Sequence, residues 1–138
     1  MRCIFIEFKY LITRNHDVNC SCIFIVKAGA LITPPLTASI LDSITRSTII
    51  DIARDDLGLE VIERDVEKEE LHIADEVFMC GTAVEVVPVF SVDKIQVGMG
   101  VKGRVTSDIT NLYLQIVRGK VEKYRKWLTP VYERQGWN

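Results

Sequence analysis

Short runs of β-branched and other apolar residues alternate along this chain with segments in which apolar residues repeat at helical spacing. We predict strands at Ile23–Lys27, Ala30–Thr33, Leu59–Ile62, Glu76–Cys80 and Val84–Val92. We predict helices within Ile44–Leu57 and Glu67–Ile73, and a third from Thr106, where Ile109, Leu112, Tyr113, Ile116 and Val117 form one apolar stripe. Strands and helices that alternate in this way indicate an α/β fold.

Residues that break regular structure mark the ends of several of these segments. The Lys27-Ala28-Gly29 turn between the first two strands predicts a β-hairpin. Gly58 and Gly119 stand where the C-terminal caps of helices belong. Pro88 lacks a backbone N–H, so the run Val84–Val92 is expected at a sheet edge or at a bulge. At 138 residues, 48% of them hydrophobic, the chain can bury one sizeable core but not two ordinary domains.

Charge and hydropathy exclude several classes of function. The 17 basic and 19 acidic residues give a net charge of -2 and are scattered along the chain. We therefore expect no nucleic-acid-binding face and no polybasic membrane surface. Residues 1–12 are apolar, but Glu7 and Lys9 interrupt them and no small-residue cleavage site follows. These features predict a soluble, cytoplasmic protein without a membrane partner.

The four cysteines, Cys3, Cys20, Cys22 and Cys80, are expected to be reduced thiols. The chain shows no secretory context, and Cys20 and Cys22 are too close in sequence to form an ordinary structural bridge. His16 together with Cys20 and Cys22 suggests zinc ligands. A structural zinc site needs four ligands, however, and the other candidates, His72 and Cys80, lie far away in sequence. No metal site is predicted.

The first loop that could carry chemistry is Leu41-Asp42-Ser43-Ile44-Thr45-Arg46, which leads into a predicted helix. Backbone N–H groups at a helix start are unpaired and carry the positive end of the helix dipole, so such a loop can hold a phosphate without a lysine. Ser43 and Thr45 add hydroxyl donors. The alternative is that Ser43 or Thr45 is simply an N-cap, and spacing alone favours this alternative.

The second loop is Gly81-Thr82-Ala83, directly after the predicted strand Glu76–Cys80. Small residues allow a backbone to approach a ligand closely, and Thr82 can donate a hydroxyl. By itself the tripeptide is a weak signal, because most turns between strands look similar.

Taken together, these segments resemble the class IV aminotransferases, and among them the branched-chain aminotransferases. Leu31-x-Thr33, followed after seven residues by Leu41-Asp42-Ser43-Ile44-Thr45-Arg46, fits the latter part of the family signature. Further segments similar to branched-chain aminotransferases are Thr33–Thr37, Ala74–Ala83, Glu85–Val89, Gly103–Thr106 and Trp127–Val131. The resemblance runs from about Ile23 to about Val131.

The resemblance implies the C-terminal, large domain of a fold-type-IV aminotransferase over residues 23–138, after a poorly matching segment at residues 1–22. Such a domain has a mixed sheet or pseudo-barrel with flanking helices. The resemblance also implies pyridoxal 5′-phosphate as cofactor, amino acids and 2-oxo acids as substrates, and a homo-oligomeric parent protein. By the same resemblance, Ile44, Thr45 and Thr82 bind the cofactor phosphate and Leu41 packs on the pyridine ring, while Thr82 and Ala83 form the turn that receives the substrate α-carboxylate.

Three features depart from the family pattern. Asp17 stands where the family has the glutamate that pairs with the pyridinium nitrogen, and Cys22 stands where an asparagine is expected. In the family the Schiff-base lysine lies well upstream of that acidic residue, and here only Lys9 precedes Asp17, too close to be that lysine. No catalytic residue is therefore assigned. The chain is expected to be a truncated gene product that is inactive alone, because the chemistry needs a placed lysine.

Three functions compete. The leading hypothesis is that the parent protein transfers the amino group of leucine, isoleucine or valine to 2-oxoglutarate. A D-amino acid aminotransferase or an aminodeoxychorismate lyase would share the Ile44-Thr45 loop, but the segments Trp127–Val131 and Phe78–Ala83 favour the branched-chain type. The third hypothesis is a non-catalytic remnant or interaction domain, which the absent lysine supports.

Overall fold

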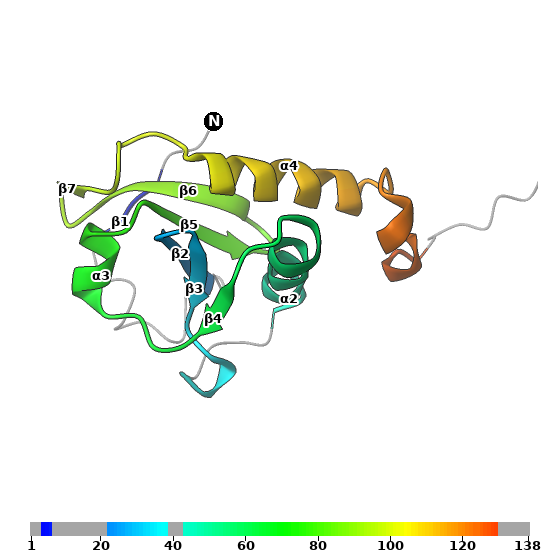
Figure 1. Ribbon diagram of the computed structural model, residues 1–138. Helices are drawn as coiled ribbons and strands as arrows, with labels where there is room; N and C mark the ends of the chain where they lie inside the picture. Colours follow the sequence, from blue (N-terminus) through cyan, green and yellow to red (C-terminus); the bar gives the residue numbers. More distant parts are fainter. Residues whose placement is uncertain (1–3, 7–21, 39–42, 130–138) are drawn as a thin grey trace, which may run out of the picture.

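The computed structural model describes residues 4–6, 22–38 and 43–129, which form one seven-stranded mixed sheet with helices packed against it (Figure 1). The strands are β1 Ile4–Ile6, β2 Cys22–Lys27, β3 Ala30–Thr33, β4 Val61–Glu63, β5 Glu76–Gly81, β6 Glu85–Val92 and β7 Ile95–Gln96. The helices are η1 Leu36–Ala38, α2 Ile44–Asp51, η2 Ile52–Asp56, α3 Lys68–His72, α4 Arg104–Val117 and η3 Glu122–Trp127. The predicted α/β fold with a mixed sheet and flanking helices is confirmed.

The sheet has the strand order β1-β6-β5-β2-β3-β4, and β7 pairs with the last residues of β6 on the edge opposite β1. The pairs β3–β4 and β1–β6 are parallel, and the other pairs are antiparallel. Strands β2 and β5 lie at the centre and carry the longest apolar runs, as expected for strands that are covered on both faces.

Two apolar cores, one on each face of the sheet, follow from the two-residue periodicity of the strands. Phe24 packs in one core together with Ile49 of α2 and Ile109 of α4. Its neighbour Ile25 points to the opposite face and packs in the second core with Leu71 of α3. Figure 1 shows α4 running along one side of the sheet and α3 on the other side of the sheet. Helices α2 and α4 therefore share one face.

The predicted hairpin is confirmed, because Lys27 pairs with Ala30 across a turn in which Ala28 and Gly29 have φ values of 50° and 81°. The strand predicted from Leu59 begins two residues later, at Val61. Leu59 still belongs to the end of the preceding helix, since its N–H donates to the Ala53 carbonyl at 2.8 Å. The helix end thus delays the start of β4.

Pro88 lies inside β6, opposite Phe78 of β5. Val89 is the first residue of β6 that pairs with β1, and the register of that pairing shifts between Ile4 and Phe5. The predicted irregularity is therefore found directly after the proline. Among the described residues, the first half of β6 up to Pro88 has β5 as its single neighbour. The second half lies inside the sheet, which corrects the sheet-edge alternative for that half.

Helix α2 continues without a break into the wider turns of η2, a π-helix in which the N–H of Leu57 donates to the Ile52 carbonyl at 3.1 Å. Gly58, with a φ of 62°, then ends it, as the sequence predicts. Glu67 and Glu70 start α3 with a capping box. Within residues 4–6, 22–38 and 43–129, no helix has both the length and the apolar character that crossing a membrane requires.

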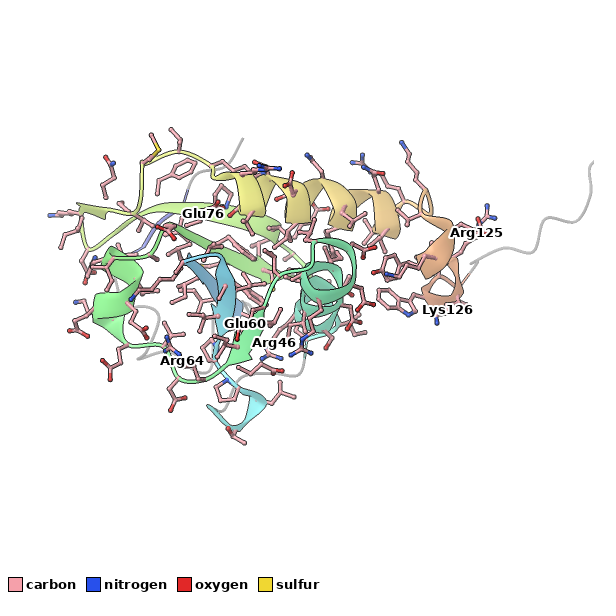
Figure 2. All side chains as sticks on the ribbon, in the orientation of Figure 1. Arg46, Glu60, Arg64, Glu76, Arg125 and Lys126 are labelled. Carbon is pink, nitrogen blue, oxygen red and sulfur yellow. The ribbon has the colours of Figure 1, made fainter. Side chains whose placement is uncertain are left out.

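Helix α4 begins at Arg104, two residues before the predicted start, because a carboxylate from the sheet caps it. Glu76 of β5, labelled in Figure 2, accepts hydrogen bonds from the N–H groups of Val105 and Thr106 at 3.0 and 2.8 Å, and from the Thr106 hydroxyl at 2.6 Å. A Cβ at Gly103 would collide with this carboxyl group. At the other end, Gly119 closes the helix with a φ of 70° and an N–H bond to the Ile116 carbonyl at 2.9 Å.

Candidate functional site

The start of α2 offers backbone donors that nothing in the described chain occupies. Ser43 is the N-cap, with φ -99° and ψ 124°, and its hydroxyl oxygen accepts from the N–H of Arg46 at 3.4 Å. This confirms the N-cap interpretation of Ser43. Within the described residues no hydrogen bond is recorded for the N–H groups of Ile44 and Thr45. Ile44 is 87% exposed and Thr45 is 5% exposed, so the donors lie at the boundary between core and solvent.

The other two α-helices of the described chain have acidic side chains at their starts. Glu67 and Glu70 occupy the backbone donors at the start of α3, and Glu76 occupies those of α4. Helix α2 has no acidic residue in its first turn. The positive end of its dipole and its unpaired N–H groups are the features that bind an external anion at a helix start.

The second predicted element, Thr82 with Ala83, forms the exposed turn between β5 and β6. The pairing ends at Gly81 opposite Glu85, and Glu85 adopts a φ of 57° that reverses the chain. Within the described residues no hydrogen bond is recorded for the N–H of Thr82 or Ala83. Small side chains and outward N–H groups fit the turn for binding a carboxylate.

The turn and the start of α2 lie at the same end of the sheet. Cys80, directly before the turn, pairs with Cys22 at the beginning of β2. The Thr33 hydroxyl at the end of β3 donates to the carbonyl of Ile23, the next residue of β2, at 2.8 Å. Arg46 of α2 in turn donates to the carbonyl of Pro34 at 2.8 Å. These contacts bring together two segments that lie more than thirty residues apart in the sequence.

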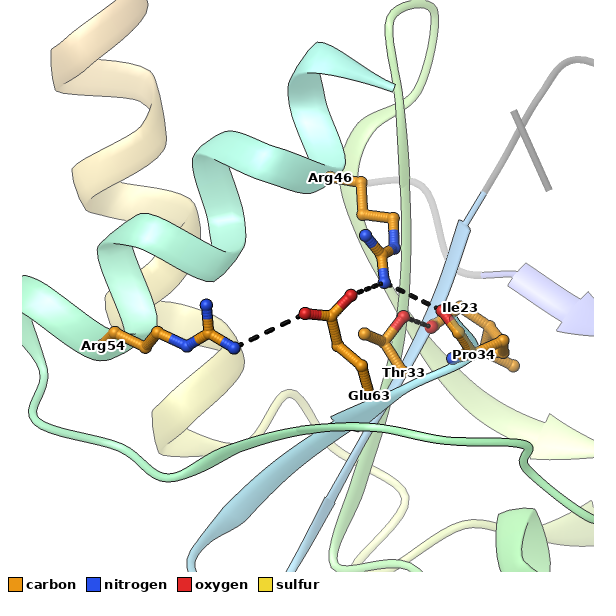
Figure 3. A network of polar contacts seen from close by, with 6 residues as sticks. All are labelled: Ile23, Thr33, Pro34, Arg46, Arg54 and Glu63. Carbon is orange, nitrogen blue, oxygen red and sulfur yellow. Dashed lines mark hydrogen bonds and ion pairs between the residues drawn. The ribbon is translucent and has the colours of Figure 1, made fainter. Parts of the chain in front are cut away.

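Arg46 is a residue to which sequence reasoning gave no role of its own. It is 2% exposed, and one of its terminal nitrogens contacts both the Pro34 carbonyl and the Glu63 carboxylate, each at 2.8 Å (Figure 3). Arg54, two turns further along the helix, reaches the same carboxylate at 3.5 Å. The hydrogen bond from Arg46 lowers the pKa of Glu63, so this carboxylate stays charged at neutral pH. The ion pair between Arg46 and Glu63 could not be predicted from the sequence, because Glu63 lies on a different element.

Two predicted residues, Asp17 and Leu41, lie outside the described residues. Cys22, which departs from the family pattern, is buried next to Cys80, and the two are not joined by a disulfide. A hydrogen bond to Cys22 and burial raise the pKa of the Cys80 thiol. The Cys80 thiol is therefore protonated and unreactive at neutral pH.

Comparison with known proteins identifies the family. The family model described as amino-transferase class IV matches residues 17–92, which is more than half of the chain. The chain belongs to the class IV aminotransferase family. This match includes both segments of the candidate site and the strands between them.

The relatives are similar over most of this chain. It is 46% identical over 112 residues to a probable branched-chain-amino-acid aminotransferase of Aquifex aeolicus, covering 81% of this chain and 36% of the relative. It is 50% identical over 109 residues to the branched-chain-amino-acid aminotransferase of Salmonella typhimurium, and the match covers 79% of this chain and 35% of the relative. The holo form of the Thermobaculum terrenum branched-chain amino acid aminotransferase superposes with a TM-score of 0.79 at 47% identity. The superposition covers 82% of this chain and 37% of that structure. This class IV aminotransferase chain thus spans about a third of the length of the relatives it matches.

Proposed function

We propose that this chain supplies the phosphate cup and the carboxylate-binding turn of an enzyme that transfers amino groups between branched-chain amino acids and 2-oxo acids. The observation that carries the proposal is the start of α2, whose first N–H groups bind no described residue, at the same sheet end as the exposed Thr82–Ala83 turn. The names of the relatives support the reaction and substrate class, and the holo form of one solved relative supports pyridoxal 5′-phosphate. When bound, this cofactor supplies an electron sink.

The residues present fit the phosphate of this cofactor. The N–H groups of Ile44 and Thr45 offer two oriented donors, and the exposed Thr82 adds a hydroxyl at the same sheet end. The buried Arg46 and the neighbouring Arg54 share one carboxylate, Glu63, so this group of three side chains carries net positive charge. Donors and charge both favour a phosphate at this position.

The described lysines support the prediction that the chain is inactive alone. Lys27 ends β2 and Lys94 follows β6, at the end of the sheet opposite the Thr82 turn. Burial lowers the pKa of Lys102, as a nucleophilic lysine requires. Lys102 lies close to the Glu76 end of β5, however, and a strand of six residues separates the two ends by about 20 Å. We infer that none of these three lysines is the Schiff-base lysine.

A non-catalytic remnant stays the second candidate, and the lysine positions favour it. Such a remnant would keep the fold but would show no preference for a phosphate-bearing ligand. A homo-oligomeric parent protein and the pairing of Asp17 with the pyridinium nitrogen also stay predictions.

Replacing Ile44 with proline tests the cup by removing a single backbone donor. Proline is favoured at the first position of a helix, and the extended Ser43 has the φ and ψ that a following proline requires. We expect the fold to be retained. The affinity for pyridoxamine 5′-phosphate should fall by about tenfold or more, because a hydrogen bond to a charged group contributes about 1.5–3 kcal/mol. Titration calorimetry measures the affinity, and this ligand needs no lysine.

The matched control is Ile44→Ala, which removes the exposed side chain and keeps the N–H. It should bind pyridoxamine 5′-phosphate like the original chain. Equal affinities for Ile44→Pro and Ile44→Ala would show that this N–H does not hold the phosphate. Unphosphorylated pyridoxamine, bound equally by all three proteins, serves as the ligand control.

A further inference from the structure

The guanidinium of Arg46 is buried in a way that surface ion pairs are not. Its side chain is 3% exposed, whereas that of Glu63 is 36% exposed and that of Arg54 is 48% exposed. The buried Nε of Arg46 has no hydrogen-bond partner in the described chain. Taking a charge out of water in this way is costly unless other contacts compensate for it. A simple surface bridge between α2 and β4 would not require this burial.

The contacts of Arg46 hold the first turn of α2 against the end of the sheet. Arg46 follows Thr45 directly, and its own N–H is bonded to the Ser43 cap. The guanidinium ties this first turn to the Pro34 carbonyl after β3 and to Glu63 at the end of β4 (Figure 3). These are the ends of two parallel, paired strands. The backbone donors of Ile44 and Thr45 therefore have a fixed relation to the end of the sheet.

We propose that Arg46 is a positioning residue, whose guanidinium holds the first turn of α2 so that the N–H groups of Ile44 and Thr45 converge on the phosphate. The inference rests on the proposed phosphate cup. It assigns to Arg46 no contact with the anion, because its side-chain hydrogen bonds go to Pro34 and Glu63. Phosphate recognition then depends on a side chain that points into the protein. A hydrogen-bond donor displaced by about 1 Å loses much of its alignment.

The test compares two ligands that differ only in the phosphate, pyridoxamine 5′-phosphate and pyridoxamine. The measured quantity is the dissociation constant of pyridoxamine divided by that of pyridoxamine 5′-phosphate, each obtained by calorimetry on the whole chain. Arg46→Met keeps much of the side-chain volume and removes both hydrogen bonds, and we expect the ratio to fall about tenfold. Arg46→Lys keeps the charge but cannot reproduce the planar fork of arginine, and we expect a fall of about threefold or more. It serves as the decisive variant if Arg46→Met does not fold.

The matched control for lost stability is Glu76→Gln, which weakens the cap of α4 at the far end of β5. A merely structural role for Arg46 would make its variants behave like Glu76→Gln, with a lower melting temperature and an unchanged ratio. That result would overturn the inference and leave the phosphate cup standing. If the original chain itself shows no preference for the phosphorylated ligand, the proposed cup is wrong and the inference falls with it.

Discussion

Replacing Phe78 with alanine is expected to lower the free energy of unfolding by about 3–5 kcal/mol, the usual cost of a large-to-small change at a fully buried aromatic residue. Phe78 is fully buried in β5, at the centre of the sheet. Its ring stacks on that of its cross-strand partner Phe24, with centroids 5.0 Å apart and an interplanar angle of 7°. Since a domain has about 5–15 kcal/mol of stability in total, this variant should lose a large fraction of the stability of the chain.

Urea denaturation followed by circular dichroism measures the loss. Phe78→Leu is the matched variant, because it keeps an apolar side chain in the same place, and it should cost less than about 2 kcal/mol. Ile95→Ala, at a position that is exposed, should change stability by less than about 0.5 kcal/mol. A small effect of Phe78→Ala, similar to that of Ile95→Ala, would mean that the described core does not hold the sheet together.

The second large effect concerns the reaction. The chain alone is expected to give no transamination of L-leucine with 2-oxoglutarate above the rate in buffer with pyridoxal 5′-phosphate, because Lys27, Lys94 and Lys102 all lie at the end of the sheet opposite the cup. When residues 23–138 are joined to the upstream part of the Salmonella typhimurium relative, where the family resemblance places the Schiff-base lysine, activity should appear. The increase should be several orders of magnitude, since enzymes accelerate reactions about 10⁶-fold or more. The measurement is glutamate formed per protein molecule.

The control for this joined protein is the same protein with the upstream lysine changed to alanine, which should return to the buffer rate. Leucine, isoleucine and valine are the expected amino donors, and D-amino acids should be poor ones. A preference for D-amino acids would contradict the branched-chain assignment in favour of a relative of the same fold. Activity of the unjoined chain would contradict the prediction that its lysines are misplaced.

Much of the fold could be predicted because local signals and tertiary structure agree. The hairpin around Ala28–Gly29, the end of η2 before Gly58 and the end of α4 before Gly119 each depend on a turn that the local sequence already favours. The starts of β4 and α4 each lie two residues from the predicted position. Leu59 is held at the helix end by the Ala53 carbonyl, which the apolar run from Leu59 does not reveal. The start of α4 depends on a distant partner, Glu76, 28 residues earlier in the chain.

The residues of the candidate site also differ in whether the local sequence could predict their role. Ser43, Ile44 and Thr45 were found because a cap and an open helix start are local properties of a sequence. Thr82 and Ala83 gained a role only through the family resemblance, since a turn of small residues is common. The network of Arg46 with Pro34 and Glu63 could not be predicted, because it joins three elements whose arrangement no local pattern records.

Amide spectra of the ¹⁵N-labelled chain report whether the start of α2, with Thr82 of the turn after β5, receives the cofactor phosphate. On titration with pyridoxamine 5′-phosphate, we expect the largest chemical-shift changes at Ile44, Thr45 and Thr82. Changes largest at Val105 and Thr106, at the start of α4 where Glu76 already occupies the donors, or no changes at a saturating concentration, would contradict this assignment.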